Sequence, residues 1–524
     1  MSEANCKASK DMHSDDVEST YKLYLRQTLT ALGPLMGVIL SGMTSGYSAV
    51  LLPQLKLPLS VINDTIVNLT DTEEIRISTI EEESWIASAA VLPMAPGCWL
   101  AGFMMEQVGR RMSVILVFPL FFVGWLTVGL ANNFSTLIIG RLICGLCAGV
   151  LGPLVPVYIS ETCDPVLRGI LLGSITLALS TGILFVHALG TWLHWRLTVY
   201  FCAVFPIICW LICFISRESP TWLLNKGKVT EARESWIYFR GEEAMDEYYA
   251  LENSRIHDTK AEEKEKNSFW SFVKEAFTTR YFLKPFGILC LFFFTAQFAG
   301  TNTVVFYSVS MLADVAGHEN AYLGSLIVDF IRLFFSALAC YLVKRCTRRS
   351  LTLVSGFGTG FTLFALSISL LYEIGTPWLP AVFLIVYTAL LPIGIIPLPW
   401  MLCGELFPRK YRGLGSGLTS GFTFMCFFVV IKMAPGMFQV LQSYGTFAIY
   451  GIVAFVGTAL LYLTLPETKD KTLQEIEKAF DKKSNRIFFS INRIYITDIV
   501  KCQPLIIIKH VSYDNYISII LIVP

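Results

Sequence analysis

Charged residues are scarce in this chain of 524 residues. Only 15% of the residues are Asp, Glu, Lys or Arg, and 54% are hydrophobic. A soluble domain carries about 25% charged residues, so the composition excludes an ordinary soluble protein. Apolar runs recur along the whole length, and each is about the 20 residues that a helix needs to cross a bilayer. We therefore predict an all-α membrane protein with many crossings.

Other absences exclude further classes. None of the 14 cysteines lies in a predicted outer loop, which disfavours a disulfide framework. The net charge of +1 gives no basis for nucleic-acid binding, and we expect none. The first 25 residues are polar and mixed in charge, so no cleavable signal peptide is expected.

Catalytic and metal-binding groupings are also missing from the sequence. His187 and His194 are isolated near one predicted helix end. Cys144 and Cys147 form a CxxC pattern inside an apolar run, where packing is a better interpretation than metal or redox chemistry. We expect neither an enzyme nor a bound cofactor or metal.

The apolar runs divide into twelve predicted membrane spans. They cover residues 29–51, 84–105, 113–131, 134–158, 168–190, 196–215, 283–312, 321–343, 349–372, 379–402, 413–434 and 445–465.

The loop charges predict the orientation in the membrane. The short loops after the second, eighth and tenth spans carry "GRR", "KRCTRR" and "PRKYR", whereas the alternate loops hold almost no Lys or Arg. Positive loops stay in the cytoplasm, so both termini and the 217–282 loop are predicted to be cytoplasmic. The outer 53–83 loop is acidic and holds two glycosylation acceptor patterns, at Asn63 and Asn68. We expect a glycoprotein of the cell membrane.

Short motifs at the ends of the predicted spans occur twice in the sequence. "GRR" after the second span matches "TRR" after the eighth, "ETCDPVLRG" after the fourth matches "ELFPRKYRG" after the tenth, and "ESP" after the sixth matches "PET" after the twelfth. Three matches in the same order predict two six-helix halves, an architecture of transporters that work by alternating access.

The repeated charges all fall at the predicted cytoplasmic rim, where we interpret them as a gate that locks and releases the two halves. An alternative is that the basic residues merely fix the topology, but this leaves the matched Glu residues unexplained. The predicted gate residues are Arg110, Arg111, Glu161, Arg168, Glu218, Arg348, Arg349, Glu405, Arg412 and Glu467.

These boundaries predict five parts of the chain. The residues between the halves alternate in charge and are typical of short surface helices. "PETKDKTLQEIEKAF" predicts another such helix, while a thirteenth span within residues 505–524 stays open as an alternative. The parts are a cytoplasmic tail 1–28, a first half 29–215, a cytoplasmic linker 216–282, a second half 283–465 and a cytoplasmic tail 466–524.

Six motifs carry a resemblance to a known family. "GRR", "PVYISE", "RESPTWLL", "GTNTVVFYS", "PLPWMLCGELFP" and "PETKDKTLQEIE" stand where the sugar porter family of the major facilitator superfamily has its signatures. The match covers roughly residues 30–480, and the chain looks most like the branch of insect facilitated trehalose transporter-like proteins. The resemblance implies the major facilitator fold and a trehalose or hexose substrate. We expect the protein to function as a monomer.

The seventh span carries residues suited to a sugar. Gln297, Asn302 and Tyr307 lie in an apolar run, and buried amides offer paired donors and acceptors for hydroxyl groups. Gly300 would let this helix bend. Trp400 offers an apolar face to a sugar ring, in a tenth span that Pro397 and Pro399 interrupt. Hydrogen bonding between helices and a core tryptophan are the alternatives.

The resemblance implies three further substrate-binding positions, and each departs from the family pattern. Thr176 stands for a Gln of glucose facilitators, Thr423 for an Asn, and Arg332 for a polar residue that is commonly Asn. Asp329 and Arg332 are three residues apart and share a helix face, so we predict that they pair. Arg332 then either lines the cavity, held by Asp329, or the two form a structural ion pair between helices.

The first span bears on the driving force. A proton-coupled porter needs a titratable group in the membrane, which in symporters of the family is an Asp in span 1. Here "ALGPLMGVILSGMTSGYSAVLLP" has no acid and no His. This favours facilitated diffusion. Proton-coupled symport through Asp329, and an orphan carrier or sensor for a non-sugar solute, remain as alternatives.

Overall fold

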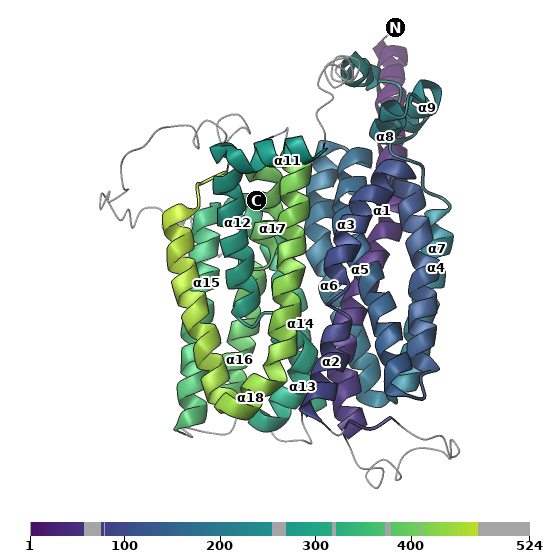
Figure 1. The fold of residues 1–524 in the computed structure, drawn as a ribbon. Helices are drawn as coiled ribbons and strands as arrows, with labels where there is room; N and C mark the ends of the chain where they lie inside the picture. The colour runs from purple at the N-terminus through teal and green to yellow at the C-terminus, as the bar shows by residue number, and fades with distance from the viewer. Residues whose placement is uncertain are drawn as a thin grey trace, which may run out of the picture.

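The protein folds as a bundle of long helices (Figure 1). The computed structural model describes residues 2–56, 75–77, 79–253, 269–316, 321–372, 379–408 and 411–469, which contain helices and no strand. Asn63, Asn68, the predicted tail helix and the alternative thirteenth span lie outside the described residues. The all-α prediction is confirmed for the described part of the chain.

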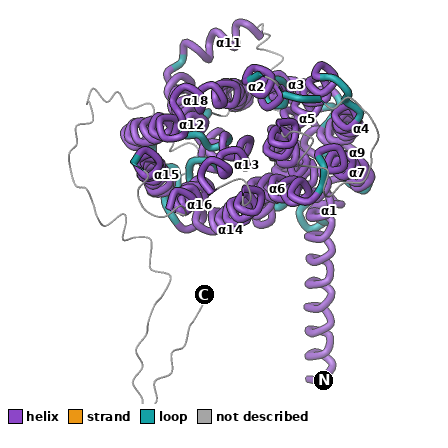
Figure 2. The backbone as a smooth tube through the Cα atoms, turned by 90° about the horizontal axis from the view of Figure 1, so that it is seen from below, coloured by secondary structure: helices purple, strands orange, loops and turns teal. Residues whose placement is uncertain are grey.

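Seven helices build the first half and make six crossings. The first begins well before the predicted span, so the polar N-terminal residues continue a helix that projects beyond the bundle (Figures 1 and 2). The helices are α1 (Ser2–Lys56), α2 (Ile80–Ala89), α3 (Met94–Gln107), α4 (Arg110–Gly129), α5 (Phe134–Thr162), α6 (Pro165–Trp192) and α7 (Trp195–Cys213).

The second crossing is broken, which the uninterrupted prediction 84–105 missed. Helix α2 ends at Ala89, and a turn leads to Pro93 before α3 begins. Proline has no N–H to donate and disfavours a continuous helix at this point. The start of α2 is fixed by a capping box, in which Thr79 Oγ1 accepts from Glu82 N at 3.2 Å.

The second half makes the remaining crossings. Its elements are α12 (Arg280–Phe298), α13 (Thr303–Ala316), α14 (Ala321–Arg345), α15 (Arg348–Leu371), α16 (Leu379–Leu390), the 3₁₀ turn η3 (Leu391–Ile393), α17 (Pro397–Leu406) and α18 (Arg412–Thr464).

Helix α18 contains two crossings rather than one. Eleven stretches of the described residues are long and apolar enough to span a membrane, and α18 is the longest, with 53 residues. At 1.5 Å per residue it would measure about 80 Å, far more than the roughly 30 Å of a bilayer core. Its backbone reverses at Gln442, where φ is 57° and ψ is 178°, and Figure 1 shows two limbs that meet at one end of the bundle. The prediction of twelve spans is therefore confirmed.

The seventh crossing bends at the glycine that the sequence singled out. Helix α12 ends at Phe298 and α13 begins at Thr303, with Gly300 between them at φ +78°. The tenth crossing is also discontinuous, as the two prolines predicted. Between α16 and α17 the backbone needs other partners, and Ser355 of α15 supplies them: its hydroxyl donates to Leu390 O at 2.7 Å and accepts from Ile395 N at 3.1 Å.

Short helices mark one end of the bundle. These are α8 (Pro220–Asn225), α9 (Val229–Arg240), a helix over 245–253 and α11 (Phe269–Thr278), as predicted for the linker. They lie at the end from which the N-terminal part of α1 projects (Figure 1). We call this end the terminal side and the other end the opposite side.

The buried core shows how the two halves meet. One continuous apolar core runs through the whole first half and into the opposite-side parts of the second half, including Val305, Phe306, Phe427 and Ile431. A separate core holds the terminal-side ends of the second half, with Phe282, Leu289, Leu398, Leu402 and Leu465. Within the described residues, the halves therefore share a buried apolar core on the opposite side and not on the terminal side.

Helices of the two halves pack together as α6 with α14, α1 with α13, and α2–α3 with α18 (Figure 2). On the opposite side, Lys432 Nζ donates to Ser84 Oγ at 2.7 Å and lies 4.0 Å from the centre of the Trp85 ring. The α6–α14 seam continues toward the terminal side, where Cys340 Sγ lies 3.1 Å from Gly173 O. The packing is closed on the opposite side.

The break at Gly300 generates a test of the fold. In the variant Gly300→Ala the new Cβ would lie 2.5 Å from Tyr450 Cδ2, on a backbone that disfavours any side chain. Such a conformation costs about 1–3 kcal/mol for a residue other than glycine. We expect a clear fall in the melting temperature of the detergent-solubilised protein, measured by size-exclusion chromatography after heating. Gly287→Ala is the matched control, because its Cβ would meet nothing within 4 Å; equal melting temperatures for the two variants would contradict the prediction.

Candidate functional site

Two of the predicted sugar-binding residues lie together at the bend in the seventh crossing. Gln297 is buried at the end of α12, and its Oε1 accepts from Asn302 Nδ2 at 2.8 Å. Tyr307 is buried at a kink in α13 and donates to Ile431 O of α18 at 3.2 Å. The two amides therefore keep further donors and acceptors for a ligand. The Tyr307 hydroxyl already uses its one O–H in the hydrogen bond to Ile431 O.

Trp400 lies in an aromatic group on the second half. Its ring centre is 5.1 Å from that of Phe293 and 6.0 Å from that of Phe424, and 39% of the residue is exposed. The ring is thus held in place while it keeps a free face. Phe424 in turn lies beside Gly152 of the first half.

Thr176 and Thr423 use their hydroxyls within their own helices. Thr176 donates to Gly173 O at 3.1 Å, and Thr423, almost fully buried, donates to Thr419 O at 3.0 Å. Thr176 belongs to α6 of the first half and Thr423 to α18 of the second half.

Arg332 of α14 is buried with two guanidinium nitrogens, Nε and Nη2, that have no hydrogen-bond partner among the described residues. The predicted close pair with Asp329 is not formed, although the two residues are near enough to attract each other. The direct partner of Asp329 Oδ2 is instead His187 Nδ1 of α6, in the first half. Two expectations are therefore wrong. His187 is not isolated, and Asp329 pairs with a residue of the other half rather than with Arg332.

A buried arginine that the sequence analysis missed lies in the first half. Arg141 of α5 donates to Ser48 Oγ and to Thr44 O, the latter at 3.1 Å, and its guanidinium lies 5.7 Å from the centre of the Tyr47 ring. No carboxylate of the described residues pairs with it. A charged residue in the middle of an apolar span is itself a signal of function, and that signal could have found Arg141.

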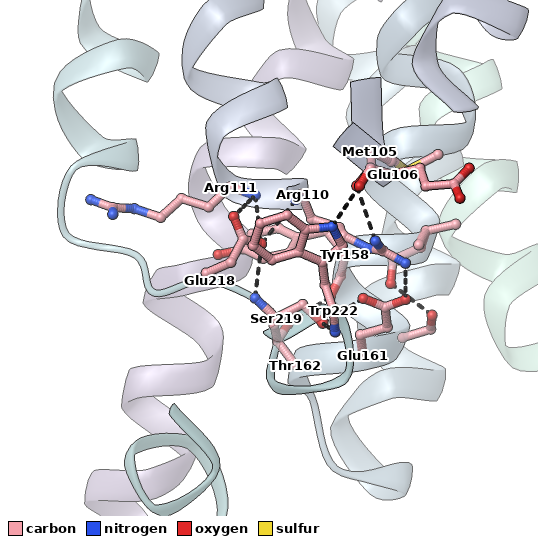
Figure 3. Close-up of polar contacts among 12 residues, drawn as sticks. Met105, Glu106, Arg110, Arg111, Tyr158, Glu161, Thr162, Glu218, Ser219 and Trp222 are labelled. Carbon is pink, nitrogen blue, oxygen red and sulfur yellow. Dashed lines mark hydrogen bonds and ion pairs between the residues drawn. The ribbon is translucent and has the colours of Figure 1, made fainter. Parts of the chain in front are cut away.

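The rim charges of the first half form one cluster (Figure 3). Glu161 Oε1 accepts from Arg110 Nη2 at 2.8 Å, and its other oxygen accepts from the Ser219 hydroxyl. Glu218 accepts from the backbone N–H groups of Arg110 at 2.9 Å and Arg111 at 3.1 Å. These are the first N–H groups of α4, which lack partners inside the helix, so the carboxylate caps that helix and meets its positive end.

The second half repeats this cluster contact by contact. Glu405 accepts from Arg348 Nη2 at 3.4 Å and from Thr468 Oγ1 at 2.6 Å. Glu467 accepts from the backbone N–H groups of Arg348 and Arg349 at the start of α15, each at 3.1 Å.

The carbonyl contacts of the arginines repeat as well. Arg110 Nη1 donates to Met105 O and Arg348 Nη1 to Val343 O. The sequence repeat is therefore a repeat of structure.

Each rim cluster lies within its own half. The contacts of these arginines and glutamates join α3, α4, α5 and the segment after α7 in one half, and α14, α15, α17 and the segment after α18 in the other. Arg168 at the start of α6 is exposed, and among the described residues no carboxylate pairs with it. Arg412 donates to Phe407 O at 3.4 Å, again within one half. The cluster contacts named above all lie inside one half and do not lock it to the other.

Twelve crossings in two matched halves, buried polar groups between them and rim clusters that repeat define a membrane transporter with the major facilitator fold. The solved structures agree on the fold. A structure of the major facilitator superfamily proton:xylose symporter XylE, bound to 6-bromo-6-deoxy-D-glucose, has a TM-score of 0.68 and 20% identity, and the match covers 88% of this chain and 99% of that chain. An inward-open structure of XylE from E. coli has a TM-score of 0.67 with 20% identity, over 86% and 98% of the two chains.

The sequence comparisons give the family. The profile of the "Sugar (and other) transporter" family matches residues 35–480, and the chain belongs to that family. The facilitated trehalose transporter Tret1 of Apis mellifera ligustica is 31% identical over 495 residues, covering 92% of this chain and 94% of its own. Tret1 of Bombyx mori is 29% identical over 477 residues, covering 90% of each chain. The predicted family is confirmed, and the protein is a sugar transporter with several membrane crossings.

The capping role of Glu218 generates a second prediction. In Glu218→Gln the charge at the start of α4 is lost and one of the two acceptor oxygens is replaced by a donor. Removal of such a cap costs about 1 kcal/mol, so we expect a lower melting temperature and a lower transport rate. Glu234→Gln is the matched control, since Glu234 is exposed on α9 at the same end. A melting temperature unchanged relative to this control would contradict the capping role.

Proposed function

We propose that the protein carries trehalose or a hexose down its gradient by alternating access, as a monomer of the cell membrane with both chain ends in the cytoplasm. The terminal side is then cytoplasmic. The basic loops on that side support this orientation, and Asn63 and Asn68 would face the exterior, where glycosylation occurs. In this proposal residues 29–215 and residues 283–465 are the two halves that move against each other.

The observation that carries facilitated diffusion is the environment of Arg141. A symporter that couples through the first span needs a titratable group there. The polar groups of α1 that meet Arg141 are the Ser48 hydroxyl and the Thr44 carbonyl, neither of which titrates in the physiological range. The buried cation is thus satisfied without a group that could gain and lose a proton at each turnover.

The substrate site in this proposal lies between the halves, lined by residues on both. Gln297 and Asn302 bind hydroxyl groups, the free face of Trp400 packs on the sugar ring, and Arg332 offers its unpartnered N–H groups. Tyr307, Thr176 and Thr423 complete the lining. A sugar suits this mixture, because its hydroxyls need many donors and acceptors around an apolar ring face.

The rim clusters act in this proposal by keeping each half rigid. A packing closed on the opposite side corresponds to a carrier open toward the cytoplasm. Arg168 and Arg412 at the rim would approach the other half when the cytoplasmic side closes, and the remaining gate charges hold the helix ends in place during that movement.

Uptake in proteoliposomes tests the proposal. We expect saturable uptake of radiolabelled trehalose or glucose that a pH gradient across the membrane does not drive above equilibrium. The variant Ser48→Asp places a carboxylate beside Arg141 and is the contrast, since it introduces a titratable group in α1 and should allow a pH gradient to drive uptake above equilibrium. If neither sugar enters nor competes, sugar transport is wrong for this chain. If a pH gradient drives accumulation by the unaltered protein, facilitated diffusion is wrong.

The substrate role of Gln297 is tested separately. Gln297→Leu removes donors and acceptors while it keeps the volume, and we expect kcat/KM for the transported sugar to fall about 2- to 10-fold, the effect of one or two hydrogen bonds. Thr388→Val is the control, because this buried hydroxyl on α16 donates to Leu384 O of its own helix, at 2.8 Å. Unchanged kinetics in Gln297→Leu would remove this residue from the site.

A further inference from the structure

His187 and Asp329 link the two halves through a buried contact. His187 lies on α6 and Asp329 on α14, and each residue is 2% exposed. His187 Nε2 also lies 2.9 Å from Gly46 O of α1. On the other ring nitrogen, Ser325 Oγ lies 3.4 Å from Nδ1, farther than the Asp329 carboxylate, and a contact of 2.8 Å joins Ser325 to Ser308.

The hydrogen-bond roles fix the number of protons in this contact. A carbonyl oxygen only accepts, so Nε2 must carry a proton that it donates to Gly46 O. A neutral imidazole with that proton has a bare lone pair on Nδ1, which an ionised carboxylate would repel. The contact between Nδ1 and Asp329 Oδ2 therefore contains one more proton, on the histidine or on the carboxyl group. The pair as a whole is neutral while it is formed.

Separation of the halves would change this balance. His187 stays with Gly46 in the first half, where a neutral imidazole that donates from Nε2 is already satisfied. Asp329 stays with Arg332, three residues further along the same helix, whose Nε and Nη2 have no partner in the closed packing. The carboxylate can pass to the guanidinium while the shared proton leaves to solvent. The proton count balances, because one proton is bound when the pair forms and one is released when it parts.

Few other charges face this contact. Helix α14 brings Arg332, and α1 brings the Gly46 carbonyl. The phenols of Tyr307 on α13 and Tyr387 on α16 donate to Ile431 O and Ala299 O. Helix α6 brings no second charge to the contact. Among the described residues, Arg332 is thus the charge placed to take over the Asp329 carboxylate.

We propose that His187 and Asp329 form a proton-binding site that latches the two halves together on the opposite side. Protonation of the pair favours the closed packing, and loss of the proton favours opening, so acid on that side holds the carrier closed. The inference rests on the alternating access of the proposed function but not on the identity of the sugar.

The position of the pair decides where the proton goes. His187 is five residues from the end of α6 at Trp192, or about 8 Å at 1.5 Å per residue, on the opposite side. Asp329 is eight residues from the start of α14 at the same side, or about 12 Å. Opening on that side exposes the pair to the fluid there, and the same fluid returns the proton on closure. The proton therefore regulates the carrier and is not itself transported.

A distance measurement tests the latch without any sugar. Spin labels at Leu130→Cys and Tyr372→Cys report on opposite-side opening, because both residues are exposed at that end, one in each half. Distances by double electron–electron resonance in nanodiscs, from pH 5.5 to 8.5, give the ratio of open to closed molecules. Labelled protein without the two new cysteines supplies the background. For one proton released on opening, the ratio rises with pH by up to tenfold per pH unit.

Two conservative variants remove the need for the extra proton. In Asp329→Asn the amide N–H donates to neutral His187 Nδ1, and in His187→Gln an amide donates to the Asp329 carboxylate. Both variants should stay closed across the pH range, with a ratio of open to closed molecules that does not change with pH. His194→Gln is the control, because His194 caps α7 within the first half at the same end, and it should keep the slope of the unaltered protein.

The outcomes separate this inference from the proposed function. A flat ratio in the unaltered protein, or an unchanged slope in both Asp329→Asn and His187→Gln, overturns the latch. A slope that disappears in these variants supports it, even if no sugar is transported, in which case only the proposed substrate is wrong. Size-exclusion profiles of each variant check that it is folded before the distances are compared.

Discussion

The hydrocarbon interior of a membrane offers no partner to a polar group, and the rest of this structure depends on that constraint. Backbone groups freed at a helix break must be satisfied by the protein itself. Ser355 does this at the break in the tenth crossing by donating to one freed carbonyl and accepting from one freed N–H. Arg141 follows the same rule for a charge, since its N–H groups donate to the Ser48 hydroxyl and to the carbonyls of Thr44 and Ile86.

At the rim the same constraint explains why each half carries two carboxylates with different tasks. Glu161 and Glu405 meet arginine side chains, whereas Glu218 and Glu467 meet the first N–H groups of α4 and α15. Charge-assisted contacts of this kind are about twice as strong as neutral ones. They tie four chain segments of a half together where the helices leave the membrane. A half held in this way can move as one body, as alternating access requires.

The sequence predicted those parts of the molecule that depend on local pattern. The lengths of the apolar runs predicted the crossings. Gly300 and the prolines of the tenth span predicted two of the breaks. The repeated Glu and Arg residues indicated where charges gather at the rim. The break before Pro93 was missed because the apolar pattern continues through it. The partner of Asp329 was missed for a different reason. Arg332 lies one turn away on the same helix, while His187 is 142 residues distant, and only the packing of α6 against α14 reveals that contact.

The exchange of partners at Asp329 follows from the energetics of buried charges. Removing one member of a buried ion pair costs about 3–5 kcal/mol, because the remaining charge is stranded. A carrier that broke such a pair at every cycle would add that amount to its barrier. Here the second half keeps a cation beside the carboxylate, and the first half keeps a histidine that can become neutral. When the halves separate, neither His187 nor Asp329 is left with an uncompensated charge, so the contact can be both buried and reversible. The same arrangement makes its stability depend on a proton, since the neutral histidine and the ionised carboxylate cannot share the contact without one.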